Sequence, residues 1–311
     1  MNWKTKLVLQ FTKLKKPIDG SAAINIHKLR KNAASGARLG SLLFDEKIKI
    51  KGLKDTEADG VPIRIYRDSD ETDLPVMIYY HGGGFVVLDL DSHDRVCRRL
   101  CKMNNCIVVS VDYRLAPEHS FPLAHDDAFT AINWVLNHIG EYRGNPEKLI
   151  LAGDSAGGNL AACMAHRCKR EQIPVKAQIL IYPWIDGKMD NPSIERNGEG
   201  YMLTKDALFW YREQYTPNPE DQCRPEVSPC YEKDFKGLPP AFVLTAEFDP
   251  LLDDGKKYFD QLKRAGNNGL YKEYPNMIHG FFNMPKISPD ALQAYKDIQI
   301  FLNLALAESK S

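Results

Sequence analysis

Ser155 stands in surroundings that suit a nucleophile. It is the centre of a Gly-Asp-Ser-Ala-Gly stretch, residues 153–157, which follows the apolar run 148–152 and precedes the Ala- and Leu-rich run 159–169. Between a strand and a helix, Gly-x-Ser-x-Gly makes a turn so tight that only small residues fit beside the serine, and its hydroxyl is pushed out at the top of the sheet. The alternative is a glycine-rich helix start that binds an anion. A nucleophilic serine also requires a base, an orienting acid and donors for a developing negative charge.

Asp249 and His279 are the candidates for the acid and the base. Asp249 follows the apolar run 241–248 and precedes Pro250, a pattern that is also typical of a helix N-cap. His279 lies in the loop after the predicted strand 269–274 and is the only histidine after residue 166. Serine, acid and histidine in this order, each after a strand, can meet at the carboxyl edge of one parallel sheet. We therefore predict Asp249 as the orienting acid and His279 as the base.

A glycine loop is the candidate for the charge-stabilising donors. His81-Gly82-Gly83-Gly84 directly follows the apolar run 76–80. Consecutive glycines let backbone N–H groups turn toward one point, because no Cβ stands in the way. The alternative is a loop that is only flexible. We predict that His81 holds this loop in place and is not a second base.

Alternating strand and helix patterns place these segments in one sheet. Strands are predicted at 47–51, 61–67, 76–80, 106–112, 148–153, 177–182, 241–247 and 269–274. Helices are predicted at 93–103, 122–137, 159–170, 251–264 and 289–304. The first two strands alternate polar and apolar residues around a glycine-bearing turn, which predicts an antiparallel edge hairpin. The later strands are nearly continuous apolar runs, so the pattern predicts a doubly wound, mostly parallel eight-stranded sheet with right-handed crossovers.

Two segments fall outside this alternation. Residues 185–235 contain no clear strand and one aromatic-rich helix, predicted at 205–215, and insertions of this length are more often functional than idle. In residues 1–45, the stretch 24–43 predicts one or two amphipathic helices with a break near Gly36. We interpret both segments as caps over the carboxyl end of a core formed by residues 46–184 and 236–311. The alternative is that the aromatic face of 205–215 is ordinary core.

The composition limits the cellular compartment and the kinds of binding partner that we expect. The chain is 43% hydrophobic and 26% charged with a net charge of zero, which is typical of a soluble globular protein and offers nothing to recruit nucleic acid or an anionic membrane. Seven cysteines form no paired pattern, which favours free thiols in a reducing compartment over a metal site. The first residues lack a signal-peptide pattern and no run of 18 apolar residues occurs, so we expect a cytoplasmic protein without membrane insertion.

Five motifs in order resemble the hormone-sensitive-lipase-like family of α/β-hydrolases, the bacterial family IV esterases. The resemblance covers about residues 45–305, and its motifs are His81-Gly82-Gly83-Gly84, Tyr113-Arg114-Leu115-Ala116-Pro117-Glu118, Gly153-Asp154-Ser155-Ala156-Gly157-Gly158, Asp249-Pro250-Leu251 and His279-Gly280-Phe281. It implies an α/β-hydrolase fold with a helical cap and a serine carboxylesterase with the triad Ser155, Asp249 and His279. It also implies catalysis without a cofactor or metal, and often a homodimer.

The resemblance implies roles for residues around the triad. The oxyanion hole would consist of the amides of Gly83, Gly84 and Ala156. Support for the loops would come from His81, Gly82, Asp154 and Gly157. Lid contacts with substrate are predicted, from the aromatic helix and its approach, for Met202, Phe209, Trp210 and Tyr211.

Substrate choice leaves alternatives open. The lack of a membrane-anchoring patch favours short- to medium-chain soluble esters as substrates. The same triad would serve an amidase or peptidase. A non-catalytic ligand receptor similar to the plant gibberellin receptors is the other alternative; in that branch the base histidine is missing, and the presence of His279 argues against it.

Overall fold

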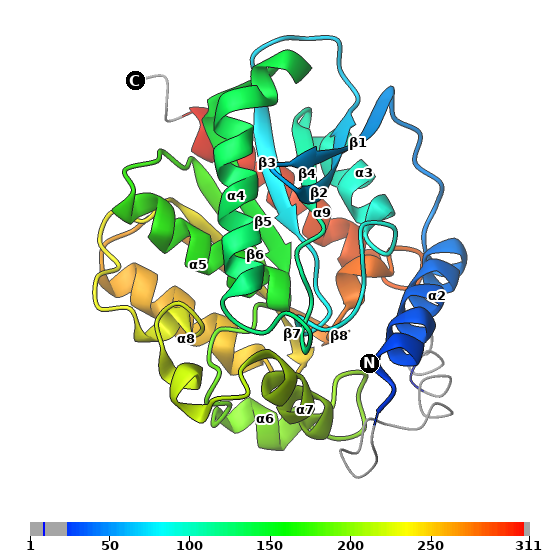
Figure 1. The fold of residues 1–311 in the computed structure, drawn as a ribbon, viewed down its shortest axis with the longest axis vertical. Coiled ribbons are helices and arrows are strands. Elements are labelled where there is room, and N and C mark those ends of the chain that lie inside the picture. The colour runs from blue at the N-terminus through cyan, green and yellow to red at the C-terminus, as the bar shows by residue number, and fades with distance from the viewer. Residues whose placement is uncertain (1–8, 10–23, 308–311) are drawn as a thin grey trace.

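The computed structural model describes residue 9 and residues 24–307 (Figure 1). At its centre lies an eight-stranded sheet with the strand order β1-β2-β4-β3-β5-β6-β7-β8. The strands are β1 (Gly52–Ala58), β2 (Val61–Arg67), β3 (Leu74–Tyr80), β4 (Ile107–Val111), β5 (Gly144–Asp154), β6 (Ala177–Ile181), β7 (Ala241–Phe248) and β8 (Gly269–Ile278). The pairs β1–β2 and β2–β4 are antiparallel, whereas the other neighbours run parallel.

Helices cover both faces of the sheet. One face packs against α4 (Leu123–His138), α5 (Ala156–Arg170) and α8 (Leu252–Arg264), and the other against α3 (Asp94–Asn104) and α9 (Pro289–Ala307). Burial on both faces explains why β4 and β6 consist of residues that are all buried. The predicted doubly wound, mostly parallel sheet is therefore confirmed, and so are the four helices predicted between its strands and the helix predicted after the last one.

The strand order reverses at β3, which lies between β4 and β5. The parallel register pairs Tyr80, the last residue of β3, with Gly153 near the end of β5. The glycine loop after β3 and the serine turn after β5 consequently leave the sheet next to each other. Such a switch point is where open α/β sheets form their sites.

The antiparallel edge hairpin and its second strand, 61–67, are confirmed, but its first strand lies later in the chain than predicted. Residues 47–51 form no strand; the hairpin pairs β1 with β2 around a turn at Asp59 and Gly60, both with positive φ. The Lys-Ile-Lys-Ile alternation of 47–50 packs on α3 instead, where Arg98 and Lys102 donate to the carbonyls of Ile48 and Lys49. The prediction of a strand at 47–51 was wrong because alternation shows that one face is buried without showing what buries it.

The N-terminal helix is continuous. α2 (Ile26–Phe44) runs through Gly36, so the predicted break there is wrong. Arg30 from its first half donates to the carbonyls of Val86 and Ala116, and Arg95 of α3 donates to the carbonyl of Ser41 near its end. Contacts at both ends hold α2 against the body as one piece. Of the predicted cap segment 1–45, residues 1–8 and 10–23 lie outside the described residues.

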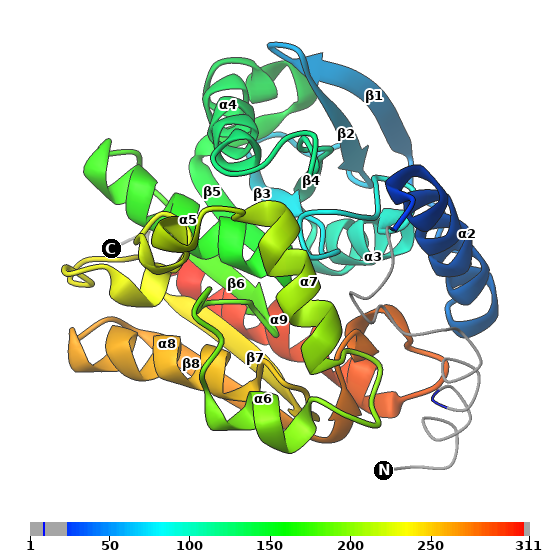
Figure 2. The ribbon, with the colours of Figure 1, turned by 60° about the horizontal axis from the view of Figure 1, so that its bottom comes forward.

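Residues 185–235 gather at the carboxyl end of the sheet. They contain α6 (Pro192–Asn197) and α7 (Lys205–Tyr215) with two short 3-10 helices, η2 (Pro219–Cys223) and η3 (Pro229–Tyr231). Figure 2 shows α6 and α7 together at the same end of the molecule, with α2 to one side. Within the described residues, no helix combines the length and apolar character that crossing a bilayer requires.

Candidate active site

Ser155 occupies a strained turn between β5 and α5. Its φ of 55° and ψ of −118° are rare for a residue with a side chain, and the surrounding packing must maintain them. The serine N–H donates to the Ile181 carbonyl (2.9 Å) and its carbonyl accepts from the Trp184 N–H (3.1 Å). A Cβ on Gly153 would come within 2.2 Å of the Gly157 oxygen, and one on Gly157 within 1.9 Å of the Tyr80 oxygen. The turn therefore requires the two glycines that the sequence pattern singled out.

Three side chains from separate loops form a continuous hydrogen-bonded row. His279, directly after β8, has Nε2 3.0 Å from the Ser155 Oγ. Its Nδ1 lies 2.7 Å from the Asp249 Oδ2 after β7. The Tyr182 ring packs beside the imidazole, with the ring centroids 4.6 Å apart. A carboxylate on Nδ1 keeps the proton there and leaves Nε2 free to accept one.

Asp249 is fully buried, and both of its carboxylate oxygens and its backbone carbonyl have hydrogen-bond partners. Its Oδ1 accepts from the Leu251 N–H at 2.9 Å, while Asn197 of α6 donates to its backbone carbonyl at 3.1 Å. Because α8 begins at Leu252, the carboxylate lies ahead of the helix and keeps Oδ2 for His279. Asn197 was not found by sequence reasoning; nothing in its local pattern distinguishes it from other polar residues of the insertion.

The glycine loop after β3 turns back beside Ser155. Gly83 and Gly84 have φ values of 119° and 61°, and the Gly83 carbonyl accepts from the N–H groups of Val86 and Val87. The Gly82 N–H donates to the Asp154 carboxylate. Within the described part of the chain, the amides of Gly83 and Gly84 have no protein acceptor, and Ala156 is the first residue of α5, whose amide is free of the helix ladder. All three amides are available to bind a negative oxygen.

His81 is a structural part of this loop. Its ring is fully buried, stacks on Tyr113 with centroids 4.4 Å apart, and has Nδ1 2.7 Å from the Gly82 carbonyl. Burial, reinforced by the nearby His93, lowers the pKa of His81 to about 4, so this ring stays neutral at physiological pH. These contacts agree with the prediction that it holds the loop.

Asp154, the residue before Ser155, is the centre of a buried cluster of polar side chains. Its Oδ1 accepts from the Tyr79 hydroxyl at 2.8 Å and from the Gly82 N–H at 3.0 Å, and lies 3.2 Å from the His93 Nε2. Burial alone would raise the pKa of this carboxyl, but the His93 charge and the Tyr79 hydrogen bond hold that pKa below its usual value. Sequence reasoning missed Tyr79 and His93, because neither belongs to a motif.

The four predicted lid residues divide into two groups. Tyr211 lies directly on the glycine loop, since a Cβ on Gly84 would be 2.5 Å from its ring, and Met202 lies beside Gly280. Phe209 instead lies among cations of its own helix, with the Arg212 guanidinium 4.8 Å from its ring centroid. Trp210 is buried against the body. The structure thus places Tyr211 and Met202 next to the glycine loop and Gly280. Phe209 instead contacts Arg212 of its own helix, and Trp210 packs into the hydrophobic core.

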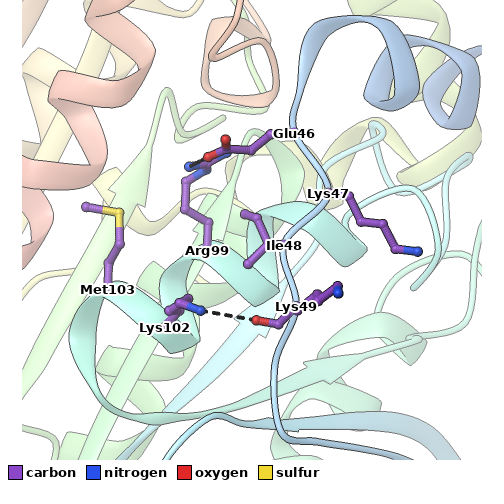
Figure 3. Close-up of a pocket in the computed structure, with 7 residues that line it drawn as sticks. All are labelled: Glu46, Lys47, Ile48, Lys49, Arg99, Lys102 and Met103. Atoms are coloured by element: carbon purple, nitrogen blue, oxygen red, sulfur yellow. Dashed lines mark hydrogen bonds and ion pairs between the residues drawn. The ribbon is translucent and has the colours of Figure 1, made fainter.

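A pocket away from the triad lies between residues 46–49 and α3 (Figure 3). The Arg99 side chain that lines it forms ion pairs with Asp45 and Glu46, and the Lys102 ammonium donates to the Lys49 carbonyl. Within the described residues no group of three or more His, Cys, Asp or Glu side chains is arranged to hold a metal ion.

The comparisons with known proteins agree with this geometry. Residues 77–283 match the family model described as the alpha/beta hydrolase fold. A carboxylesterase of Mycobacterium tuberculosis is 39% identical over 239 residues, covering 75% of each chain. An ethyl acetate hydrolase of Pseudomonas putida is 35% identical over 276 residues, covering 86% of this chain and 87% of that protein.

The solved structures include a hyperthermophilic esterase from the archaeon Pyrobaculum calidifontis. It superimposes with a TM-score of 0.88 at 34% identity and covers 95% of this chain and 96% of its own. The family match spans more than half of this chain and includes the glycine loop, the serine turn, Asp249 and His279. This chain therefore belongs to the α/β-hydrolase family, and within it to the hormone-sensitive-lipase-like carboxylesterases.

Proposed function

We propose that this protein hydrolyses short- to medium-chain carboxylic esters through an acyl-enzyme formed on Ser155. The observation that carries the proposal is the hydrogen-bonded row from Ser155 through His279 to Asp249, with distances of 3.0 and 2.7 Å. A serine hydroxyl is a weak nucleophile until a base takes its proton, and this arrangement supplies the base already oriented.

The reaction proceeds in two halves. Ser155 Oγ attacks the ester carbonyl carbon while the His279 Nε2 accepts the serine proton. The resulting oxyanion accepts hydrogen bonds from the amides of Gly83, Gly84 and Ala156. As the carbon–oxygen bond to the alcohol breaks, His279 protonates the leaving alcohol and Ser155 holds the acyl group. A water molecule then gives its proton to His279, attacks the acyl carbon, and releases the acid as the proton returns to Ser155.

The two caps restrict access to this site. We propose residues 1–45 and 185–235 as the cap, and 46–184 with 236–311 as the core. Support for the second cap segment comes from Asn197, which donates to the backbone of Glu247 and Asp249, and from Tyr211, which packs on Gly84. Tyr211 and Met202 narrow the approach to Ser155, which favours short acyl chains over long ones.

The remaining parts of the proposal concern the cellular location, the substrate and the oligomeric state. We propose a cytoplasmic location, supported by seven cysteines that are all free thiols. The substrate is a small-molecule ester, and no cofactor takes part in the steps above. The homodimer implied by the family resemblance stays a prediction, which the mass of the purified protein in solution would test.

Ser155→Ala tests the nucleophile. We expect the variant to lose ester turnover by about 10⁶-fold in kcat, because the serine and its base act as one unit. Turnover of p-nitrophenyl esters measures this loss. A series of increasing acyl length, tested on the unmodified chain, also measures the chain-length preference. The thermal unfolding midpoint serves as the folding control. A well-folded variant that keeps more than one hundredth of the activity would disprove the assignment.

The same panel separates the alternatives. Matching anilides test the amidase interpretation, because an amidase cleaves the anilide at a rate comparable to the ester. A fluorophosphonate probe tests the receptor interpretation, since a protein without a reactive serine is not labelled. We expect ester cleavage and labelling in the unmodified chain, and neither in Ser155→Ala.

A further inference from the structure

We propose that His93 and Asp154 form a positioning pair that holds the oxyanion loop in register with the nucleophile. The inference rests on the proposed function and deepens it. Asp154 precedes Ser155 in the chain, so its backbone is joined directly to the serine. Its carboxylate accepts a hydrogen bond from the Gly82 N–H, which belongs to the loop that carries Gly83 and Gly84. The carboxylate thus connects the two halves of the site that must be placed relative to each other.

Three donors from three segments converge on this one carboxylate. They are the Tyr79 hydroxyl of β3, the Gly82 amide of the glycine loop, and the His93 ring, whose Nε2 is 3.2 Å from Oδ1 and 3.4 Å from Oδ2. The side chains of Asp154 and His93 are 5% and 3% exposed, so water competes little for these hydrogen bonds. A carboxylate with so many donors has a single favoured orientation.

The packing around Gly82 leaves no room for a different arrangement. A Cβ at this position would lie 2.5 Å from the Asp154 Oδ2 and 3.1 Å from its carbonyl oxygen. The loop backbone therefore rests directly on the carboxyl group. A displacement of the Asp154 side chain must move the loop, and with it the amides of Gly83 and Gly84.

His93 is fixed from its other side. Its Nδ1 lies 3.0 Å from the Ser92 Oγ, and that hydroxyl donates to the Asp89 carbonyl at 2.5 Å. The Ser92 hydroxyl holds Nδ1, and the Asp154 carboxylate holds Nε2. Both ring nitrogens are occupied by protein groups, so His93 positions the site and takes no proton from substrate.

The test compares His93→Gln with a matched variant, His166→Gln. His166 is also buried, but lies on α5 among the rings of Phe235 and Tyr258, with no carboxylate partner among the described residues. For each variant we would measure kcat and KM on p-nitrophenyl butyrate, and the inhibition constant of a trifluoromethyl ketone. The ketone forms a covalent adduct with the serine whose oxygen occupies the oxyanion hole.

We expect His93→Gln to lower kcat by about 10- to 100-fold with KM within threefold, since a misplaced oxyanion donor weakens binding of the transition state alone. The ketone inhibition constant rises by the same factor as kcat falls. His166→Gln keeps the values of the unmodified chain. Ser92→Ala, which removes only the hydroxyl behind His93, lowers kcat by a smaller factor in the same direction and serves if His93→Gln fails to fold.

Three results would overturn the inference. The first is an unchanged kcat in His93→Gln, or in Ser92→Ala if His93→Gln does not fold. The second is a loss of kcat without a matching rise in the ketone inhibition constant, and the third is an equal loss of kcat in folded His166→Gln. Ser155→Ala assayed in parallel separates this inference from the function on which it rests. If Ser155→Ala is inactive and His93→Gln is fully active, only the positioning pair is disproved. If Ser155→Ala remains active, the proposed function fails first.

Discussion

Two histidine–carboxylate pairs flank Ser155, and they are built from the same chemical groups. His279 pairs with Asp249 on one side, and His93 pairs with Asp154 on the other. Both carboxylates are buried. The pairs differ in what the second ring nitrogen meets: a serine hydroxyl facing the site for His279, and the Ser92 hydroxyl, itself bound to a carbonyl, for His93.

In our proposal, this difference separates the histidine that acts as a base from the histidine that only positions the site. An imidazole acts as a base only where one nitrogen is unprotonated and faces the reacting proton. His279 meets that condition because Asp249 accepts a hydrogen bond from the far nitrogen and keeps the proton there. His93 does not, because its two nitrogens face Ser92 and Asp154 and neither faces the Ser155 hydroxyl. Residue type and carboxylate partner are therefore insufficient to identify a catalytic histidine.

The largest expected effect comes from replacing the first histidine. His279→Gln should lower kcat by about 10⁵- to 10⁶-fold, because it removes the base that activates Ser155. Measured beside His93→Gln on the same ester, it should leave at least a thousandfold gap between the two variants. Equal losses in two well-folded variants would show that our division of the pairs is wrong.

A smaller effect should follow from disturbing the second pair through the backbone. In Gly82→Ala the new methyl group would press on the Asp154 carboxylate, from which its ideal position is only 2.5 Å. We expect kcat to fall by about 10- to 100-fold, as for one misplaced oxyanion donor. Gly140→Ala is the control, since nothing lies within 4 Å of a Cβ there. Kinetics of Gly82→Ala that match those of the control would contradict the link between Asp154 and the loop.

The smallest effect concerns His166, a histidine buried without a carboxylate. Burial, aided by Arg170 and Lys169, lowers the pKa of His166 to about 3 from 6.5. Between these values the unfolded chain binds a proton that the folded chain does not, so the free energy of unfolding falls as the pH falls. His166→Gln should reduce this dependence by about 1.4 kcal/mol per pH unit.

Urea unfolding at pH 6.0, 5.0 and 4.5 would measure that slope. The exposed His138, replaced by Gln, provides the matched control for the loss of one histidine. An identical slope in His166→Gln and the unmodified chain would mean that His166 is protonated in the folded state, against its burial. The esterase activity at neutral pH should be the same in all three proteins.

Much of the site could be predicted from local patterns. Ser155 is identified by the glycines on both sides, and the structure shows the Gly153 and Gly157 contacts that demand them. Asp249 and His279 were found by their order and by their positions after apolar strands. These features are readable because a parallel sheet brings the ends of its strands to one edge, so that position after a strand predicts position in space.

The predictions that were wrong, and the residues that were not predicted, have one common cause. The segment 47–51 has the alternation of a strand but packs on α3. The helix α2 continues through Gly36 because both of its ends contact distant segments: its own Arg30 binds the Val86 carbonyl, and Arg95 of α3 binds the Ser41 carbonyl. Tyr79, His93 and Asn197 have no motif to mark them. Each of these outcomes depends on a neighbour that is far away in the chain, and spacing along the chain carries no information about such neighbours.

The sequence by itself determined which chemistry is available: a serine in a tight turn, an acid, a histidine and a row of glycines, in an order that one sheet can assemble. The order of the motifs already selected His279 among eight histidines, whereas only the tertiary structure placed His93 beside Asp154. An imidazole takes its role from the groups on its two nitrogens, and for His279 and His93 those groups come from different loops. Folding brings these groups together, because burial in a closely packed interior leaves each ring one set of partners.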